Sequence, residues 1–223
     1  MFKLNPHYEL IEEELLGSKI YMIDNFYNNP QEIEDYLFAE PAPLHKQHES
    51  PSFNNIHFED RRLNKGDKRL APIYRFLSDL VSQQPQGNKI RTNQTRFYRN
   101  CGNDFENCYW WPHQDSGYNG IIYFNEGCEC GTNIYKRRGN KVMPGEHYKP
   151  WRPKEDFKVL KHLEPKYNRL VFFDGFKFLH GMNICNDRYF SEEYRKNQVF
   201  FFDRLKRLKR LENKRQTVRK VAQ

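Results

Sequence analysis

The stretch WPHQDSG, residues 111–117, carries the strongest signal in this sequence. His113 and Asp115 are two residues apart, and side chains at that spacing in an extended chain point to the same side. The two can therefore reach one metal ion together. A third ligand has to come from elsewhere, and His180 is the best candidate because it ends the strand-like run NRLVFFDGFKFLH, residues 168–180.

Two imidazoles and one carboxylate on one face of an ion leave its other positions open, as in non-haem Fe(II) oxygenases. A His-x-Asp pair alone is a weak signal, and the alternative is a surface turn with an incidental histidine. The order of the flanking segments favours the metal site. The pair stands between a strand with Tyr98 and the strand GIIYFN (120–125), and Gly131-Thr132, the run 168–174 and Arg195 follow.

Short strands separated by turns dominate the second half of the chain, which favours an antiparallel double sheet. We predict these strands at 89–99, 120–125, 132–136, 157–163, 169–174 and 197–205. The first half has a strand at 19–27, a helix that starts at Pro30 after a possible N-cap at Asn29, and a helix over 71–81 with a core-facing apolar stripe. Residues 41–70 and 137–156 are predicted to be loops.

The length of 223 residues suggests one domain. Only 37% of the residues are hydrophobic, but aromatic residues make up 16% and bury a large area each, so a core can form. No apolar run approaches the roughly 20 residues of a membrane span. The start, MFKLNPHYEL, lacks the apolar core of a secretory signal.

Five cysteines, an odd number without a regular spacing, predict free thiols in a reducing, cytoplasmic setting. The pair in Cys128-Glu129-Cys130 is interpreted as free thiols in a turn, with metal binding as the alternative.

The net charge of +8 is concentrated at the end of the sequence. Leucines at 205, 208 and 211 repeat among lysines and arginines, which predicts a basic helix over 204–223 with one packed face. The charge permits contact with a polyanion such as nucleic acid, although a solvated basic helix is the commoner explanation.

Taken in order, these segments resemble the 2-oxoglutarate/Fe(II) dioxygenase superfamily, and within it the prolyl 4-hydroxylase-like group, over about residues 90–203. That group's pattern is a tyrosine strand, His-x-Asp, a Tyr-Leu-Asn-like strand, Gly-Gly-Thr, an apolar strand ending in Phe, a distal His and a basic residue before the last strand. Here Gly-Gly-Thr reads Cys130-Gly131-Thr132, and the glycine after Tyr98 comes one residue late, at Gly102. Asp115 is present, whereas the halogenating branch has a small residue there, so the resemblance favours hydroxylation.

The resemblance implies a mainly β fold with supporting helices (α+β), a double-stranded β-helix of the jelly-roll or cupin-like kind. It predicts a single domain over 1–223, with mainly helical support in 1–89, the β-helix core in 90–203 and the basic C-terminal helix in 204–223. The implied cofactors are Fe(II), the cosubstrate 2-oxoglutarate and O2, with ascorbate as an optional addition. His113, Asp115 and His180 are the implied metal ligands and catalytic residues.

The far carboxylate of 2-oxoglutarate needs a cation, and the fork of an arginine can bind both of its oxygens. The position that matches the group's basic residue is Arg195. Lys196 is its rival if the register slips by one, and Arg188 is third.

Three further residues are candidates for the cosubstrate pocket. Tyr98 matches a tyrosine that hydrogen-bonds the cosubstrate, and Tyr123 and Asn125 lie on the strand after the His-x-Asp pair. For Tyr98 the alternative is a core aromatic residue.

The predicted reaction is hydroxylation of a C–H bond in a peptidyl (for example prolyl) or small-molecule substrate, with release of succinate and CO2. A nucleic-acid-directed oxygenase and a non-catalytic jelly-roll binding module are the alternatives. No membrane partner is expected, and the sequence leaves the oligomeric state open.

Overall fold

The computed structural model describes residues 1–39, 55–59, 68–85, 91–97, 105–127, 130–139, 150–190 and 193–203. For residues 55–59, 84, 85, 91 and 203 it describes the backbone alone. This part of the chain is mainly β-structure with two α-helices, and its strands pair in antiparallel fashion. None of its helices is long and apolar enough to cross a membrane. The predicted basic helix over 204–223 lies outside the described residues.

The larger sheet has the strand order β1-β2-β11-β7-β13-β5-β3, with β4 paired to β13. Its strands are β1 Glu9–Leu15, β2 Ser18–Asp24, β3 Asn55–Glu59, β4 Gln84–Pro85, β5 Arg91–Phe97, β7 Tyr118–Tyr123, β11 Leu170–Asp174 and β13 Arg195–Asp203. A smaller sheet has the order β10-β8-β12, formed by β8 Thr132–Arg137, β10 Phe157–Leu163 and β12 Leu179–Met182. A two-stranded pair joins β6 Cys108–Trp110 to β9 Trp151–Pro153.

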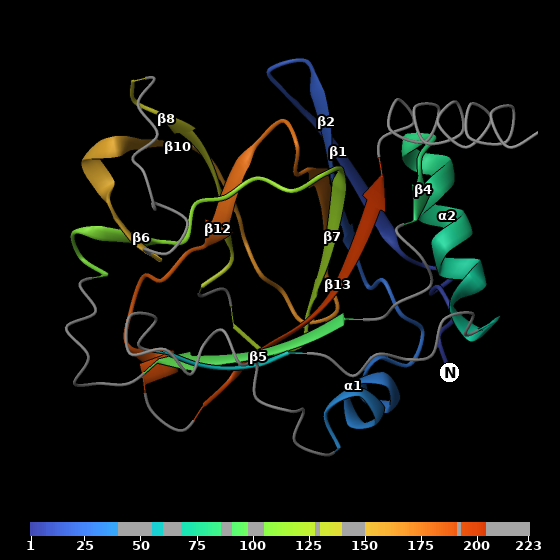
Figure 1. The fold of residues 1–223 in the computed structure, drawn as a ribbon. Helices are drawn as coiled ribbons and strands as arrows, with labels where there is room; N and C mark the ends of the chain where they lie inside the picture. The colour runs from blue at the N-terminus through green and yellow to red at the C-terminus, as the bar shows by residue number, and fades with distance from the viewer. Residues whose placement is uncertain are drawn as a thin grey trace, which may run out of the picture.

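The larger sheet separates two cores, as the alternation along β7 shows. Ile122 packs in a core built with helix α1 (Pro30–Phe38) and helix α2 (Ala71–Val81). Tyr123 faces the other way and packs with Ile134 of β8. In Figure 1 the smaller sheet lies to the left of the larger one and α2 to its right. The candidate ligands, on β12 and just before β7, therefore belong to the side that faces the smaller sheet.

Both predicted helices are present. Helix α1 starts at Pro30 with Asn29 in the N-cap position, although the Asn29 side chain makes no capping hydrogen bond. Helix α2 spans 71–81 as predicted and ends at Ser82, which adopts the left-handed conformation at φ 51°. Of its apolar stripe, Ile73 and Leu77 are fully buried, and Phe76, Leu80 and Val81 are partly buried against the same core. The predicted strands of the second half are confirmed with shifts of a few residues at their ends.

The strand-like run 168–180 is divided into two strands in different sheets. The main-chain carbonyl of Asp174 accepts hydrogen bonds from the N–H groups of Lys177 and Phe178, at 3.1 and 3.0 Å. The Asp174 carboxylate also accepts one from the N–H of Phe176 at 3.1 Å. Aspartate favours such turns because its short side chain satisfies nearby backbone donors. His180 therefore lies within β12, after this turn, and does not end the preceding apolar strand.

Residues 1–89, expected to be mainly helical, also supply strands β1, β2 and β3 to the larger sheet. Strand β1, ELIEEEL, was not predicted because its glutamates have low strand propensity. It pairs with β2 across a tight turn at Leu16-Gly17, whose φ angles are 50° and 69°. Residues 41–70 were predicted to be a loop, but they contain strand β3 and a 3-10 helix at Lys68–Leu70. Positions 41–54 and 60–67 lie outside the described residues.

A buried asparagine joins the ends of three strands of the larger sheet. The Asn168 side chain accepts a hydrogen bond from the Tyr27 N–H and donates one to the Tyr27 carbonyl, both at 2.9 Å. Its own N–H donates to the carbonyl of Tyr123 at 2.9 Å. Asn168 adopts a left-handed backbone at φ 60°, which asparagine tolerates better than most residues.

We predict that Asn168→Ala lowers the free energy of unfolding by about 2–4 kcal/mol, because the buried backbone groups of Tyr27 lose their partners and alanine disfavours positive φ. Asn168→Gly keeps the backbone conformation and removes only the amide, so it should cost less, about 1–3 kcal/mol. Urea denaturation followed by tryptophan fluorescence measures both. A glycine variant as stable as the unchanged protein would show that the amide contributes nothing.

Candidate metal centre

A two-way backbone contact brings the two candidate histidines together. The N–H of His113 donates to the carbonyl of His180 at 2.9 Å, and the N–H of His180 donates to the carbonyl of His113 at 2.8 Å. Two residues further on, the N–H of Asp115 donates to the carbonyl of Gly175 at 2.8 Å. The loop 111–117 is thus anchored along β12 and the turn before it.

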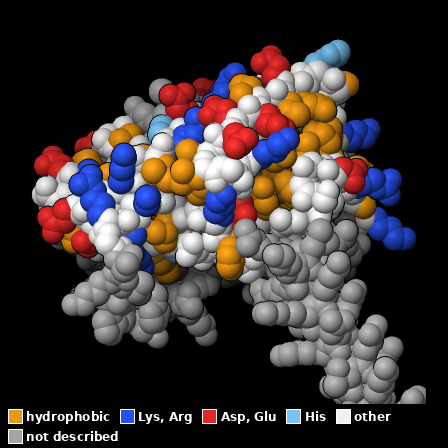
Figure 2. Space-filling view, turned by 90° about the horizontal axis from the view of Figure 1, so that it is seen from above, with side chains coloured by type: hydrophobic (Ala, Val, Ile, Leu, Met, Phe, Trp, Pro, Cys, Tyr) orange, Lys and Arg blue, Asp and Glu red, His pale blue; other side chains and the backbone are white. Residues whose placement is uncertain are grey.

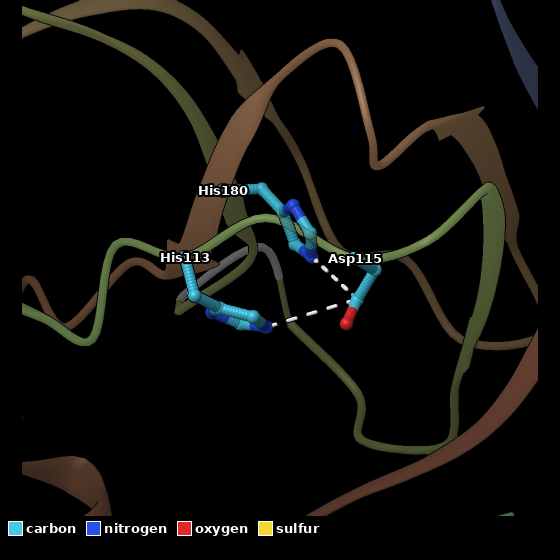
Figure 3. Close-up of side chains that lie close together, drawn as sticks. All are labelled: His113, Asp115 and His180. Atoms are coloured by element: carbon cyan, nitrogen blue, oxygen red, sulfur yellow. Dashed lines mark ion pairs between the residues drawn. The ribbon is translucent and has the colours of Figure 1, made fainter. Parts of the chain in front are cut away.

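The side chains of His113, Asp115 and His180 converge, as Figure 3 shows. Oδ2 of Asp115 lies 3.2 Å from Nε2 of His180 and 3.8 Å from Nε2 of His113. One ligand atom from each residue lies within 4.8 Å of the others. Nitrogen and oxygen ligands sit about 2.0–2.2 Å from a first-row divalent ion, so two at right angles are about 3 Å apart. The Asp115–His180 separation of 3.2 Å already fits one ion, and the His113 side chain, 3.8 Å from Asp115, has to move closer to complete the set.

Hydrogen bonds fix which nitrogen of each imidazole is free to bind a metal. Nδ1 of His113 lies 2.8 Å from the carbonyl oxygen of Trp111, and Nδ1 of His180 lies 3.1 Å from that of Phe178. A carbonyl oxygen only accepts, so in the neutral form of each ring Nδ1 carries the proton and Nε2 keeps a lone pair. Metal-binding histidines usually donate their other nitrogen in this way. The donor set therefore suits a metal ion.

The ionisation states also suit metal binding. Burial, and then the neighbouring His180, lower the pKa of His113 from 6.5 to about 4. Burial alone would raise the pKa of Asp115, but the hydrogen bond and charge of His180 and the charge of His113 outweigh it and lower that pKa to about 2. At neutral pH His113 is therefore neutral and Asp115 ionised, which are the forms that bind metals.

The close approach of the loop to β12 depends on a residue without a side chain. A Cβ atom at Gly181 would lie 2.5 Å from the carbonyl oxygen of Trp110 and 3.0 Å from that of Trp111. Trp111 itself has a left-handed backbone, with φ 44°, which redirects the chain just before His113. Its N–H donates to the carbonyl of Pro150 at 2.6 Å and so holds this bend in place.

Asn119 on β7 is a part of the site that the sequence reasoning missed. Its amide nitrogen donates to Oδ2 of Asp115 and lies 3.1 Å from Nε2 of His180. Its oxygen is buried and has no hydrogen-bond partner among the described residues. Strand alternation could have found it: side chains two residues apart share a face, so Asn119 lies on the same face of β7 as Tyr123, four residues later.

Arg195 lies on the same side of the larger sheet as Tyr123. Arg195 is buried, with 7% of the residue exposed, and its guanidinium carbon lies 5.3 Å from the centre of the Tyr123 ring. Its Nε donates to the carbonyl of Cys130 at 2.9 Å, and the hydroxyl of Tyr123 lies 2.8 Å from that of Thr132. Among the described residues, no carboxylate forms an ion pair with Arg195. A buried cation without an anion is costly, so this environment favours an anionic ligand.

The rival cations are engaged elsewhere. Lys196 points toward α1, where its Nζ lies 3.0 Å from a carboxylate oxygen of Glu34. Arg188 pairs with Glu193, with one nitrogen–oxygen distance of 2.6 Å. The structure thus separates Arg195 from the other two by orientation, while its role in binding a cosubstrate stays a prediction.

Two other pocket candidates have different outcomes. Asn125 binds the backbone of β13: its oxygen accepts from the N–H of Lys196 at 2.6 Å, and its nitrogen donates to the carbonyl of Tyr194 at 2.9 Å. Its amide is therefore used to hold β13 in place. Tyr98 lies outside the described residues.

The Cys130-Gly131-Thr132 segment has the backbone shape that glycines allow. A Cβ atom at Gly131 would lie 2.2 Å from the carbonyl oxygen of Leu163. Cys130 adopts φ 57°, a left-handed conformation that costs a non-glycine residue about 1–2 kcal/mol. The cysteine at the first position therefore keeps the conformation that a glycine would take there.

The described part of the chain is thus a mainly antiparallel β-protein with a candidate His-Asp-His metal centre between its two main sheets. No family model matches the chain, and no curated protein does. Among solved structures it is similar to an oxidoreductase of the 2OG-Fe(II) oxygenase family from Burkholderia pseudomallei, at 15% identity and a TM-score of 0.43, covering 80% of this chain and 79% of that one. A likeness at this level does not define a function, so the chemistry has to be inferred from the residues of the site.

We predict that the chain binds one divalent ion through His113, Asp115 and His180. Titration of the metal-free protein with Mn(II), a probe that avoids oxidation, should show one site. His180→Ala should abolish that binding, because two remaining ligands hold an ion far more weakly than three. His162→Ala is the control, because this half-buried histidine bonds Asn133, at 2.8 Å. Unchanged binding by the His180 variant would contradict the assignment.

We also predict that Asn119→Ala weakens Mn(II) binding by about tenfold or more, because the hydrogen bond that orients the Asp115 carboxylate is lost. Asn133→Ala is a matched control: Asn133 is buried on β8 and donates to Asn183 at 2.9 Å, away from the ligands. The control should lower stability and leave the metal affinity unchanged. Equal Mn(II) affinities in the two variants would show that Asn119 does not contribute to metal binding.

Proposed function

We propose that this chain is an Fe(II)- and 2-oxoglutarate-dependent dioxygenase that hydroxylates a C–H bond. The observation that carries the proposal is the convergence of two imidazole Nε2 atoms and one carboxylate within 4.8 Å. Three protein ligands of this kind leave positions of an octahedral ion open, and that favours non-haem Fe(II) over a closed structural zinc site. The fold proposed with it is the double-stranded β-helix, or jelly roll.

Each residue of the site has a defined task in this proposal. His113 and His180 hold the ion through Nε2, and their Nδ1–H groups keep both rings oriented. Asn119 fixes the rotamer of Asp115 by donating to its carboxylate. When bound, Fe(II) and 2-oxoglutarate supply the activation of O2, with release of succinate and CO2 and transfer of one oxygen atom to the substrate. The presence of a carboxylate at Asp115 supports hydroxylation over halogenation.

Arg195 is the proposed anchor for the far carboxylate of 2-oxoglutarate. It is buried, it faces the same side of the sheet as Tyr123, and it has no carboxylate partner among the described residues. An arginine fork can bind both oxygens of a carboxylate. A dicarboxylate would therefore satisfy the metal with one end and Arg195 with the other.

The proposed substrate is a peptidyl, for example prolyl, group or a small molecule, as the sequence resemblance implies. The nucleic-acid alternative depended on basic charge. On the face shown in Figure 2, lysine and arginine side chains are interleaved with acidic ones and form no continuous basic patch over the described residues. The cysteines at 108, 130 and 185 are free thiols, which supports the proposal of a reducing, cytoplasmic setting.

The test is conversion of 2-oxoglutarate to succinate by the purified protein with Fe(II) and O2, in the absence of added substrate. Slow, metal-dependent conversion is expected, and His113→Ala should abolish it. Binding is measured separately as the shift in melting temperature caused by 2-oxoglutarate with Mn(II). Binding without succinate formation would support a non-catalytic binding module, and the absence of both would overturn the proposal.

A further prediction separates Arg195 from its neighbour. Arg195→Ala should raise the apparent KM for 2-oxoglutarate by about tenfold or more, because a charge-assisted contact worth roughly 1.5–3 kcal/mol is lost. Mn(II) affinity should not change. Lys196→Ala is the control, expected to remove only the ion pair with Glu34 and leave the KM unaltered. The opposite pattern, with the loss in the Lys196 variant, would reverse the assignment.

A further inference from the structure

Two thiols lie side by side outside the metal centre. The Sγ atoms of Cys130 and Cys185 are 3.8 Å apart, although 55 residues separate them in the chain. The pairing of β8 with β12 continues beyond the strand ends, since the N–H of Asn183 donates to the carbonyl of Gly131 at 2.9 Å. This pairing brings the two cysteines together. Cys130 is buried and Cys185 is exposed.

We propose that Cys130 and Cys185 form a reversible disulfide in response to a hydroperoxide, and that this bond weakens anion binding at Arg195. A disulfide requires the sulfur atoms to approach to about 2.05 Å. From 3.8 Å this is a small movement. It can be made by side-chain rotation with a modest shift of the two segments that carry the cysteines.

The exposed thiol reacts first. The Cys185 thiolate attacks one oxygen of the hydroperoxide, so that an S–O bond forms, the O–O bond breaks, and the leaving oxygen takes up a proton. The Cys130 sulfur then loses its proton and attacks the resulting sulfenic acid, so that the S–S bond forms and the hydroxyl leaves as water. The two thiols lose two electrons and two protons in all, and hydrogen peroxide is reduced to two water molecules. Burial raises the pKa of Cys130 to about 11, which makes it the second thiol to react.

The consequence at Arg195 rests on the proposed function and on one hydrogen bond. The carbonyl oxygen of Cys130 accepts from Nε of Arg195 at 2.9 Å, so the residue that would be cross-linked also positions the proposed cosubstrate anchor. The backbone of Cys130 is left-handed at φ 57° and has little freedom to adjust. Movement of its sulfur toward Cys185 is therefore passed to its carbonyl group and on to Arg195.

The first experiment uses the full chain with Cys101, Cys108 and Cys128 replaced by serine, so that only the pair remains. After hydrogen peroxide treatment, intact mass should fall by two hydrogen atoms, and peptide mapping should link 130 to 185. Dithiothreitol should reverse the change. The cross-link should raise the melting temperature by about 5 °C or more. Sulfinic or sulfonic acid at 185 without a cross-link would overturn the proposal.

The second experiment measures 2-oxoglutarate binding, with Mn(II) present, to the oxidised and reduced forms of the same protein. Loss of a hydrogen bond to Arg195 should weaken binding roughly two- to tenfold on oxidation. Cys185→Ser in that background should bind alike before and after treatment. A cross-link that forms without changing the affinity would overturn the regulatory part. A protein that forms the cross-link but binds no 2-oxoglutarate in either state would instead contradict the proposed function.

Discussion

The pair of backbone hydrogen bonds between His113 and His180 is the constraint on which the site depends. At 2.9 and 2.8 Å, they join a loop with an irregular backbone to a regular strand of the smaller sheet. Both imidazoles then extend from neighbouring points, and each ring is oriented by a carbonyl oxygen two residues earlier in the chain. Asp115 needs only a short reach to complete the set. The approach of the two imidazoles is thus set by backbone hydrogen bonds, and the Asn119 amide orients the carboxylate.

The convergence of His113, Asp115 and His180 could be predicted from the sequence because their chemistry and much of their spacing are local. His113 and Asp115 share one short loop, and the apolar strands on either side have clear patterns. Arg195 was preferred because it matches the basic residue of the group that the sequence resembles, and strand alternation left Lys196 as its rival. In the structure Arg195 faces Tyr123, whereas Lys196 faces α1.

Other features could not be predicted because they depend on contacts between distant segments. Strand β1 is rich in glutamate and forms a strand because β2 offers it a partner. The division of the run 168–180 into β11 and β12 depends on how Asp174 bonds its own turn. Asn119 lies beside Asp115 only once β7 and the loop are folded together. Local pattern indicates the strands that have a clear apolar periodicity, whereas it does not show which strands pair.

Gly181 adds one position to the sequence motif that should be used to search for such a site. A chain that keeps both histidines and the aspartate but carries alanine after the second histidine would pass a search that reads ligands alone. Its extra methyl group would meet the carbonyl oxygen of Trp110 at 2.5 Å, and the loop with His113 would have to move away from β12. Such a chain would have all three candidate ligands in its sequence and would still not bring them together. A search for this kind of site should therefore require glycine directly after the second histidine, because only glycine leaves room for the loop to approach β12.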